Sequence, residues 1–308
     1  MNEYRYIYGP VPSRRLGISL GVSPIPKKTC NYSCIYCQLG RTDHLTNTRQ
    51  MFYPVEEIID ELKIFQDTLT PFDVITIVGE GEPTLYLGLG ELISQIRKIT
   101  PKPVAVITNG ALLYDPELQD ELAKADIILP TLDAWDEASF KKINRPHKSM
   151  KYSQVINGIE TFSKEYQGQL WIEIMLMQGI NDDDQALNQY KTMLKKLKFD
   201  KLYINTPVRP PAETDVNPVE HERINQIAEH LGGISIDLLE SKGFHSEIKD
   251  DYQAILSIIK RHPMNQFEIE GFLKARDINS GEELLSRLKS DSAVEVIHYK
   301  GYETYRLK

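Results

Sequence analysis

Cysteine is scarce in this chain, because only three of the 308 residues carry a thiol. All three lie between residues 30 and 37, so they cannot form a disulfide scaffold that connects distant segments. Long apolar runs are lacking too, since no stretch approaches the ~20 continuous apolar residues of a membrane helix. The sequence therefore argues against a disulfide-stapled domain and against a membrane helix, and it favours a reducing compartment.

Positive charge is not in excess, since 36 Lys and Arg face 44 Asp and Glu, for a formal net charge of −8. Such a surface is unfavourable for general binding to nucleic acid. The first 49 residues depart from the average, with seven basic side chains against only Glu3 and Asp43. This end could hold an anionic substrate, or its charges could pair with the acidic remainder or be solvated.

The length and a hydrophobic content of 41% allow a sizeable core. One large α/β domain, or such a domain with a small appendage, fits this size. The opening string MNEYRYIYGP lacks the apolar stretch of a signal peptide. We therefore expect a cytoplasmic protein.

The three cysteines, Cys30, Cys34 and Cys37, form the string CNYSCIYC. A structural zinc site normally has four Cys or His ligands, so zinc would need a further ligand such as His44. Three thiolates can instead hold all but one iron of a cubic [4Fe–4S] cluster and leave that iron open. A chance grouping of buried thiols is the third interpretation.

Short β-branched runs alternate with amphipathic segments from residue 18 to about residue 259, which predicts a parallel α/β sheet with right-handed crossovers. The expected strands are 18–23, 73–78, 103–108, 126–132, 170–176 and 201–206. The expected helices lie near 54–69, 88–99, 116–124, 152–166 and 183–198. Periodicity alone does not decide between an open barrel and a doubly wound sheet.

Polar and glycine-rich strings follow these strands at their carboxyl ends, the edge where barrel enzymes place their chemistry. After the cysteines come GEGEPTL (79–85), TNG (108–110), TLDA (131–134), IMLMQGIND (174–182) and INTPVRPPAE (204–213), one behind each successive strand. We therefore expect the cysteines and these strings to meet in one site.

The CxxxCxxC triplet, followed one β/α unit later by GEGEPTL, resembles the radical S-adenosylmethionine (SAM) superfamily. The resemblance implies an α/β fold, a partial (β/α)6 open TIM-like barrel, in which the three cysteines hold a [4Fe–4S] cluster whose open iron chelates SAM. It also implies SAM contacts at Tyr36 (adenine), Glu82 (methionine ammonium) and Asp133 (ribose). The other implied SAM contacts are Gly79, Gly81, Pro83, Thr108 and Asn109.

Simpler interpretations exist for several of these residues. Tyr36 could merely cover the cluster, and a glycine-rich turn between strand and helix is often only a turn. Asn109 could be a left-handed turn residue, and Asp133 could cap the next helix.

The strings INRPH (143–147) and YINTPVRPPAE narrow the resemblance to the branch that contains the tRNA wyosine-base synthases, and YGPVPSRRLGISLGV fits uncharacterised relatives there. The match spans about residues 8–215. Archaeal wyosine synthases carry a second set of cysteines, which this chain lacks. Arg145, His147 and Arg209 are candidates for contacts with substrate or with the SAM carboxylate, because Arg offers a rigid fork for carboxylate or phosphate. They could equally be surface residues of loops.

The resemblance implies an oxidoreductase that cleaves SAM reductively to a 5′-deoxyadenosyl radical, which abstracts hydrogen from a substrate. A reductant protein such as a flavodoxin or ferredoxin is then expected. The substrate could be a tRNA base or nucleotide, or instead a protein or small metabolite. A redox-sensing, DNA-binding regulator that uses the cluster as its sensor is a further hypothesis.

The pattern changes near residue 262, which predicts two domains, 1–259 and 260–308. Two short helices, 266–275 and 281–290, precede a hairpin with a Lys-Gly turn, and this order resembles a small winged-helix module. Residues 256–308 carry nine basic and eight acidic side chains. Contact with nucleic acid and a role in packing or protein docking are both compatible with this balance.

Overall fold

A computed structural model describes residues 4–66, 68, 70–236, 243–244, 246, 248–278, 281–299 and 301–308. The main feature is an eight-stranded sheet with the order β1-β2-β5-β6-β7-β8-β9-β10. Only β1 runs antiparallel to its neighbour. The strands are β1 (Ile7–Ser13), β2 (Gly17–Val22), β5 (Val74–Ile77), β6 (Val104–Thr108), β7 (Ile127–Pro130), β8 (Gln169–Met175), β9 (Lys201–Asn205) and β10 (Ile234–Ser235).

All six strands expected from the sequence are present, as β2 and β5 to β9, each within two residues of its predicted ends. The five helices expected between these strands are also present. They are α1 (Val55–Gln66), α2 (Leu89–Ile99), α3 (Pro116–Leu122), α5 (Tyr152–Glu165) and α6 (Asp184–Leu194). Residues 67 and 69 of the first predicted helix lie outside the described residues. Two of these helices, α3 and α6, have an aspartate as N-cap. The carboxylate of Asp115 accepts a hydrogen bond from Glu117 N, and the carboxylate of Asp183 accepts one from Ala186 N.

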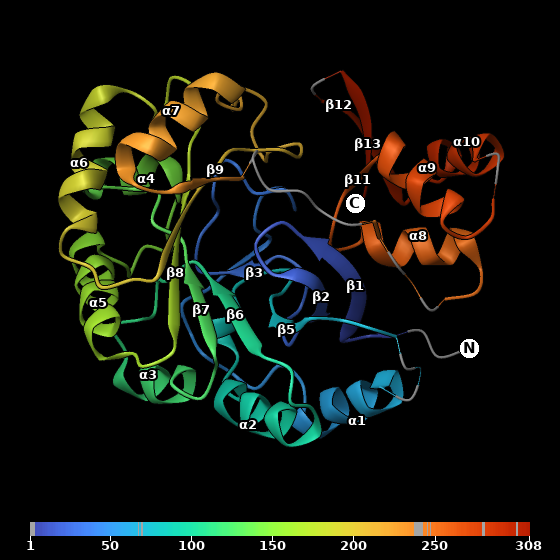
Figure 1. Cartoon of the computed structure of the whole chain (residues 1–308), viewed down its shortest axis with the longest axis horizontal. Helices are drawn as coiled ribbons and strands as arrows, with labels where there is room; N and C mark the ends of the chain where they lie inside the picture. The colour runs from blue at the N-terminus through green and yellow to red at the C-terminus, as the bar shows by residue number, and fades with distance from the viewer. Residues whose placement is uncertain are drawn as a thin grey trace.

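Several elements were not predicted, namely β1, β10, α4 (Glu137–Ile143), α7 (His221–Leu231), α8 (Asp251–Ile259), β11 (Met264–Asn265), the single-turn helix η1 (Pro83–Leu85) and the short strands β3 (Thr29–Cys30) and β4 (His44–Leu45). The last two pair with each other in parallel and carry the first cysteine. In Figure 1, α1, α2, α3, α5 and α6 run along the outer face of the sheet.

The alternation of side chains along each strand separates two layers. In β8, Leu170, Ile172 and Ile174 face outward into the main core beneath the helices. Trp171 belongs to a separate small apolar cluster, while Glu173 lines a cavity further along the strand. The sheet is thus packed with apolar side chains near the start of its strands and hollow near their carboxyl ends.

The C-terminal elements form a second group beside β1, coloured orange to red in Figure 1. They are α8 (Asp251–Ile259), β11 (Met264–Asn265), α9 (Gln266–Lys274), α10 (Glu282–Ser290), β12 (Val294–Tyr299) and β13 (Tyr302–Leu307). Their three strands form a sheet with the order β11-β13-β12. We call residues 251–308 the C-terminal module. The Lys-Gly turn of its hairpin includes residue 300, which lies outside the described residues.

The core of the C-terminal module is shared with the large sheet. Ile255 and Ile258 of α8 pack in one cluster with Met264 and Tyr305, and Tyr8 and Val11 of β1 complete it. The packing therefore crosses the predicted boundary after residue 259, and the division into domains 1–259 and 260–308 stays a prediction.

No helix among the described residues is both long and apolar enough to cross a membrane.

Candidate functional site

A cavity of about 310 Å³ opens at the carboxyl ends of the strands, and all three cysteines line it. Its walls come from the segments after β2, β5, β6, β7 and β9 and from the end of β8. Of the residues implied as SAM contacts, Tyr36, Gly79, Gly81, Glu82, Thr108 and Asn109 also line this cavity. We call it the cysteine cavity. Pro83 and Asp133 lie outside its lining.

The cysteine loop packs directly on the GEGEP turn. Thr29 O accepts from Glu82 N at 3.0 Å, and Lys28 N donates to Glu80 O. A Cβ at Gly81 would lie 1.9 Å from Thr29 O, so only glycine allows this approach. The glycine of the motif therefore brings two backbone segments together beside Cys30.

Glu82 is buried, at 3% exposure, and its carboxylate accepts four hydrogen bonds from the protein. Oε1 accepts from Thr84 N (3.1 Å), Thr84 Oγ1 (2.6 Å) and Thr108 Oγ1 (2.6 Å), and Oε2 accepts from Asn109 N (2.8 Å). Burial raises the pKa of this carboxyl, and the donors oppose that rise. Because a carboxylate offers about four acceptor sites, the protein itself largely satisfies Glu82.

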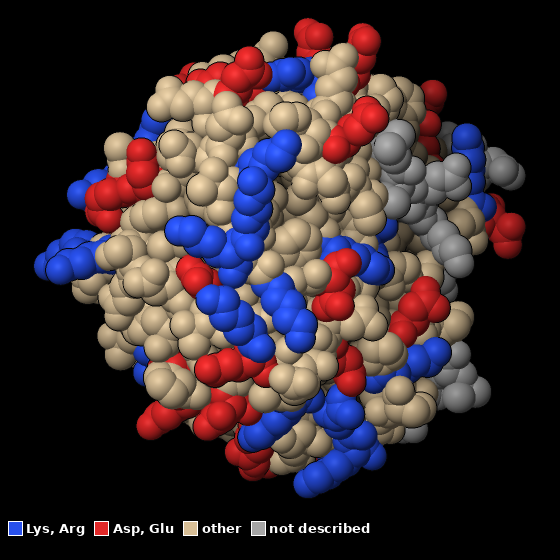
Figure 2. Space-filling model, turned by 60° about the vertical axis from the view of Figure 1, so that its left-hand side comes forward, with Lys and Arg blue, Asp and Glu red and all other residues tan. Residues whose placement is uncertain are grey.

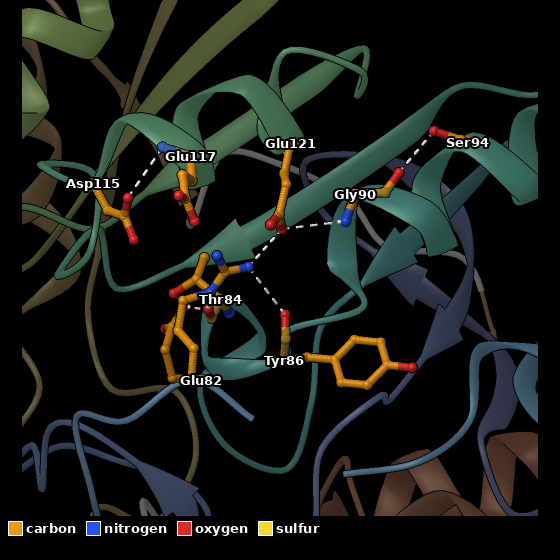
Figure 3. A network of polar contacts seen from close by, with 9 residues as sticks. Glu82, Thr84, Tyr86, Gly90, Ser94, Asp115, Glu117 and Glu121 are labelled. Atoms are coloured by element: carbon orange, nitrogen blue, oxygen red, sulfur yellow. Dashed lines mark hydrogen bonds and ion pairs between the residues drawn. The ribbon is translucent and has the colours of Figure 1, made fainter. Parts of the chain in front are cut away.

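The turn after Glu82 is held from its other side by Arg49. Its guanidinium donates to Thr84 O (3.0 Å), to Tyr86 O (3.2 Å) and to Glu121 Oε2 (2.5 Å). Figure 3 shows Glu82 and Thr84 on one side of this network and Glu121 with Gly90 on the other. The GEGEP turn is thereby fixed to α2 and α3.

Asp133 lies behind Tyr36 and is 3% exposed. Its carboxylate accepts from Tyr36 Oη, from Asn144 Nδ2 (3.1 Å) and from Met175 N (2.9 Å). Burial raises the pKa of Asp133 to about 7, although these three donors oppose the rise. The structure thus places Asp133 where it orients Tyr36, while Tyr36 itself faces the cysteine cavity.

Two cysteine sulfurs accept hydrogen bonds from side-chain amides. Asn144 Nδ2 lies 3.5 Å from Cys34 Sγ, and Asn109 Nδ2 lies 3.7 Å from Cys30 Sγ. The same Asn109 amide donates to Asn31 Oδ1 at 2.6 Å. Donors placed next to sulfur are the usual surroundings of iron-bound thiolates.

The donor set fits a cluster better than a single ion. Burial raises the pKa of all three thiols, so thiolates at neutral pH need a compensating cation. No group of three or more His, Cys, Asp and Glu in the described part of the chain converges on one metal position. A cluster spreads its thiolates over several irons and does not require such convergence. His44 is exposed on β4 and does not line the cavity.

The structure separates the three proposed substrate residues. Arg145 pairs with Glu213 at the surface, and the half-buried His147 contacts Ser149 through its Nδ1. Neither residue lines the cysteine cavity. Arg209 does line it, and its fork donates to Glu268 of α9 through two bonds of 2.9 Å. Arg209 therefore joins the cavity wall to the C-terminal module.

Sequence reasoning missed several buried charged residues near the cavity. Glu173 pairs with Arg15 and stands inside the apolar run of β8. A charged residue within an apolar strand could have been recognised in the sequence as a candidate for a buried ion pair. Glu80 pairs with Arg261 at 3.3 Å, and both side chains are about 5% exposed. Nothing in the local sequence of Arg261 indicated this pairing, because 181 positions separate the partners.

The fold and the site together define an α/β protein with a mainly parallel sheet and three cysteine thiols in a cavity at the carboxyl ends of its strands. The family model "Radical SAM superfamily" matches residues 25–189, which is more than half of the chain, and the chain belongs to this superfamily. The predicted membership is thereby confirmed. Members of the superfamily are enzymes that normally bind SAM and a [4Fe–4S] cluster.

One relative matches along almost the whole chain. The UPF0026 protein MJ1312 of Methanocaldococcus jannaschii is 33% identical, over 97% of this chain and 94% of that protein. The GTPase Obg of Brachyspira hyodysenteriae is 37% identical over 83% of this chain, but the match spans only 38% of that protein's length. The activity in that name therefore belongs to a much longer protein, most of which has no counterpart in the match.

Among solved structures, the one described as "Structure of TYW1 with a lysine-pyruvate adduct bound" aligns with 72% of this chain and 74% of that chain, at a TM-score of 0.50 and 22% identity. This likeness concerns the fold alone. It agrees with the predicted resemblance to the wyosine synthases and with the mainly parallel sheet.

Proposed function

We propose that the chain is a radical SAM oxidoreductase that uses a [4Fe–4S] cluster at Cys30, Cys34 and Cys37. The observation that carries this proposal is the convergence of three thiols, the GEGEP turn and Asn109 on one cavity at the carboxyl ends of the strands. When bound, the cluster and SAM supply one-electron chemistry: reductive cleavage of SAM to a radical that abstracts hydrogen from a substrate.

The residues of the chain hold and orient these groups. Tyr36, fixed by Asp133, supplies an aromatic wall for the adenine. Gly79 and Gly81 carry no side chain that could cover the backbone of the turn, so this backbone can approach the methionine part of SAM. Gly81 also allows the close contact with Thr29 O. Glu82 acts through the turn that it fixes, together with Pro83 and Thr108, and orients the backbone around SAM.

Amide donors to the sulfurs are a second contribution of the protein. Asn109 and Asn144 donate to Cys30 and Cys34, and hydrogen bonds to cluster sulfurs tune the reduction potential. Electrons have to come from outside, so we propose a flavodoxin or ferredoxin as reductant partner. Arg145 and His147 do not line the cysteine cavity. They therefore remain candidates only for contacts with a part of the substrate that lies outside this cavity.

A tRNA substrate is the second candidate, supported by the fold likeness to TYW1 and by the winged-helix resemblance of the C-terminal module. Its element order, α8-β11-α9-α10-β12-β13, agrees with such a module. Figure 2 shows a face on which Lys and Arg form a band bordered by Asp and Glu, so the basic side chains there are interspersed with acidic ones. Retention of bulk tRNA that weakens with salt would support this substrate class.

The direct test of the proposal is iron and sulfide analysis after anaerobic reconstitution. We expect about four irons per chain, and we expect Cys30→Ala, Cys34→Ala and Cys37→Ala each to lose the cluster, because the chain has no spare thiol. Stoichiometric zinc without charge-transfer absorption in protein purified without oxygen would contradict the proposal. A cluster that forms without any cleavage of SAM would favour the redox-sensing regulator.

A further inference from the structure

A second cavity, of about 250 Å³, lies beside the cysteine cavity, and we call it the inner cavity. Its walls come from β1 and the turn after it, from the carboxyl ends of several strands, and from the C-terminal module. Arg15, Val78 and Arg209 are among the residues that line both cavities, so the two are adjoining. A molecule in the inner cavity would therefore lie next to whatever the cysteine cavity binds.

The described lining of the inner cavity is rich in arginine. It contains four arginines, Arg14, Arg15, Arg209 and Arg261, and a single carboxylate, Glu268. Glu268 pairs with Arg209, while Glu173 and Glu80, which stand outside this lining, pair with Arg15 and Arg261. A wall of guanidinium groups suits an occupant that accepts several hydrogen bonds, as a carboxylate or a phosphate does. The volume suits a small molecule.

Arg15 has donors left for such an occupant. Its Nη1 donates to Glu173, and in the described part of the chain its guanidinium makes no other hydrogen bond. A guanidinium carries five N–H donors in a planar fork, which matches a carboxylate or a phosphate. The side chain is 19% exposed, so an ion bound there would be largely shielded from solvent.

One polar atom contributed by the C-terminal module lacks a partner among the described residues. His262 Nδ1 is buried without a hydrogen bond to any of them, whereas Arg261 Nε, which also makes no hydrogen bond, forms an ion pair with Glu80 Oε2 at 3.3 Å. Burial, together with Arg209 and Arg14, holds the pKa of His262 well below its usual range, which keeps the imidazole neutral. A buried polar atom without a partner costs free energy, and a bound ligand would recover it.

We propose that the inner cavity is the substrate pocket and that it binds a small molecule through its carboxylate or phosphate group, held by Arg15 and His262. This assignment rests on the proposed function, because it places the substrate beside the SAM site. It also explains what the C-terminal module contributes, since the module supplies His262 and closes the pocket through Arg261 and Glu268.

The test is isothermal titration of the reconstituted full-length protein with inorganic phosphate and, in a separate arm, with malonate. We expect at least one anion to bind, and the stronger arm identifies the anionic group. Arg15→Gln should weaken binding by about ten- to a hundredfold, the usual effect of losing a charge-assisted hydrogen bond. Arg15→Lys, which keeps the charge but not the fork, should fall in between.

The matched control is Arg97→Gln. Arg97 also pairs with a carboxylate, Asp126, but it lines neither the cysteine cavity nor the inner cavity. We expect this variant to bind the anions as the unmodified protein does. Cluster content and SAM binding, measured on the same samples, show whether each variant is folded.

Failure of both anions to bind at about 10 mM would overturn the proposal, as would equal binding by the unmodified protein and Arg15→Gln. If the protein holds four irons and binds SAM but not the anions, only this inference fails. If no cluster forms, the proposed function fails, and the anion titration still decides the inner cavity. Salt-sensitive binding of tRNA that Arg15→Gln abolishes, without small-anion binding, would replace the small molecule by a nucleic acid.

Discussion

Gly81 is the residue at which the cysteine loop and the GEGEP turn touch. A Cβ there would meet the carbonyl oxygen of Thr29, which is backbone and cannot swing away. Gly81→Ala should therefore destabilise the fold by about 1–3 kcal/mol and reduce iron incorporation. Urea unfolding and iron analysis measure the two effects.

Gly271 provides the matched control for Gly81. It lies inside α9, and a Cβ at this position would meet nothing within 4 Å. Gly271→Ala should be neutral or stabilise by up to about 1 kcal/mol, since alanine is the better helix former. Equal effects of the two substitutions would show that the close approach at Gly81 has no energetic weight.

Glu82 carries a second prediction at this scale. Gln in its place offers only one acceptor oxygen to the four donors from Thr84, Thr108 and Asn109. Glu82→Gln should destabilise the protein by about 1.5–3 kcal/mol and weaken SAM binding through the loosened turn. Calorimetry with SAM and urea unfolding test both. Weaker SAM binding at unchanged stability would instead indicate a direct contact with the ammonium of SAM.

Asp133 gives a prediction about pH. Its pKa is raised from 3.8 to about 7 in the folded state, so the folded protein binds this proton more tightly than the unfolded chain. This group therefore favours folding most below about pH 4, and its contribution is lost as pH rises towards 7. In Asp133→Asn, the free energy of unfolding should fall less between pH 5 and 7.5 than in the unmodified protein. Parallel pH profiles of the two proteins would contradict the raised pKa.

Single residues were predicted unevenly from the sequence. The cysteines, Gly81 and Asn109 were found because a fixed spacing or a turn at a strand end marks them. The contacts of the predicted site residues could not be predicted. The four hydrogen bonds to Glu82 and the placement of Asp133 behind Tyr36 depend on how the strands pack side by side. Arg15, Arg261 and His262 carried no local signal, because their surroundings come from distant parts of the chain.

At the scale of elements, the β/α units were predicted well and the irregular ones poorly. The six central strands are short apolar runs that alternate with amphipathic segments, and this alternation marks them clearly. β10 has only two residues, too few for a clear period. β1 contains two prolines, which obscure a strand that lies at the edge of the sheet.

The attachment of α8 predicts the result of a truncation. A chain that ends at Arg261 loses α9, α10 and the strands that cover Ile255 and Ile258. We expect this chain to bind a hydrophobic dye, to unfold without cooperativity and to incorporate little iron, because the exposed face also includes Tyr8 and Val11 of β1. A soluble truncated protein with full iron content would instead support an independent module that begins after residue 259.

At the scale of the whole molecule, a chain with a net charge of −8 has a cavity lined by four arginines. The basic side chains of the first 49 residues are divided between the surface and the cavities: Arg41 pairs with Glu213 at the surface, while Arg15 faces both cavities. Formal charge along the sequence could show the excess but not this division. The proposed class of substrate could not be inferred from the sequence, because the inner cavity is formed by β1 and the C-terminal module together.

We propose that the cysteine cavity binds SAM at a cluster and that SAM is cleaved there. The most direct measurement is the formation of 5′-deoxyadenosine and methionine by the reconstituted protein under dithionite without oxygen. We expect both products from the unmodified protein and neither from Cys37→Ala, which retains every other residue of the cavity. A protein with about four irons per chain that binds SAM and yields neither product, or equal yields from both proteins, would contradict it.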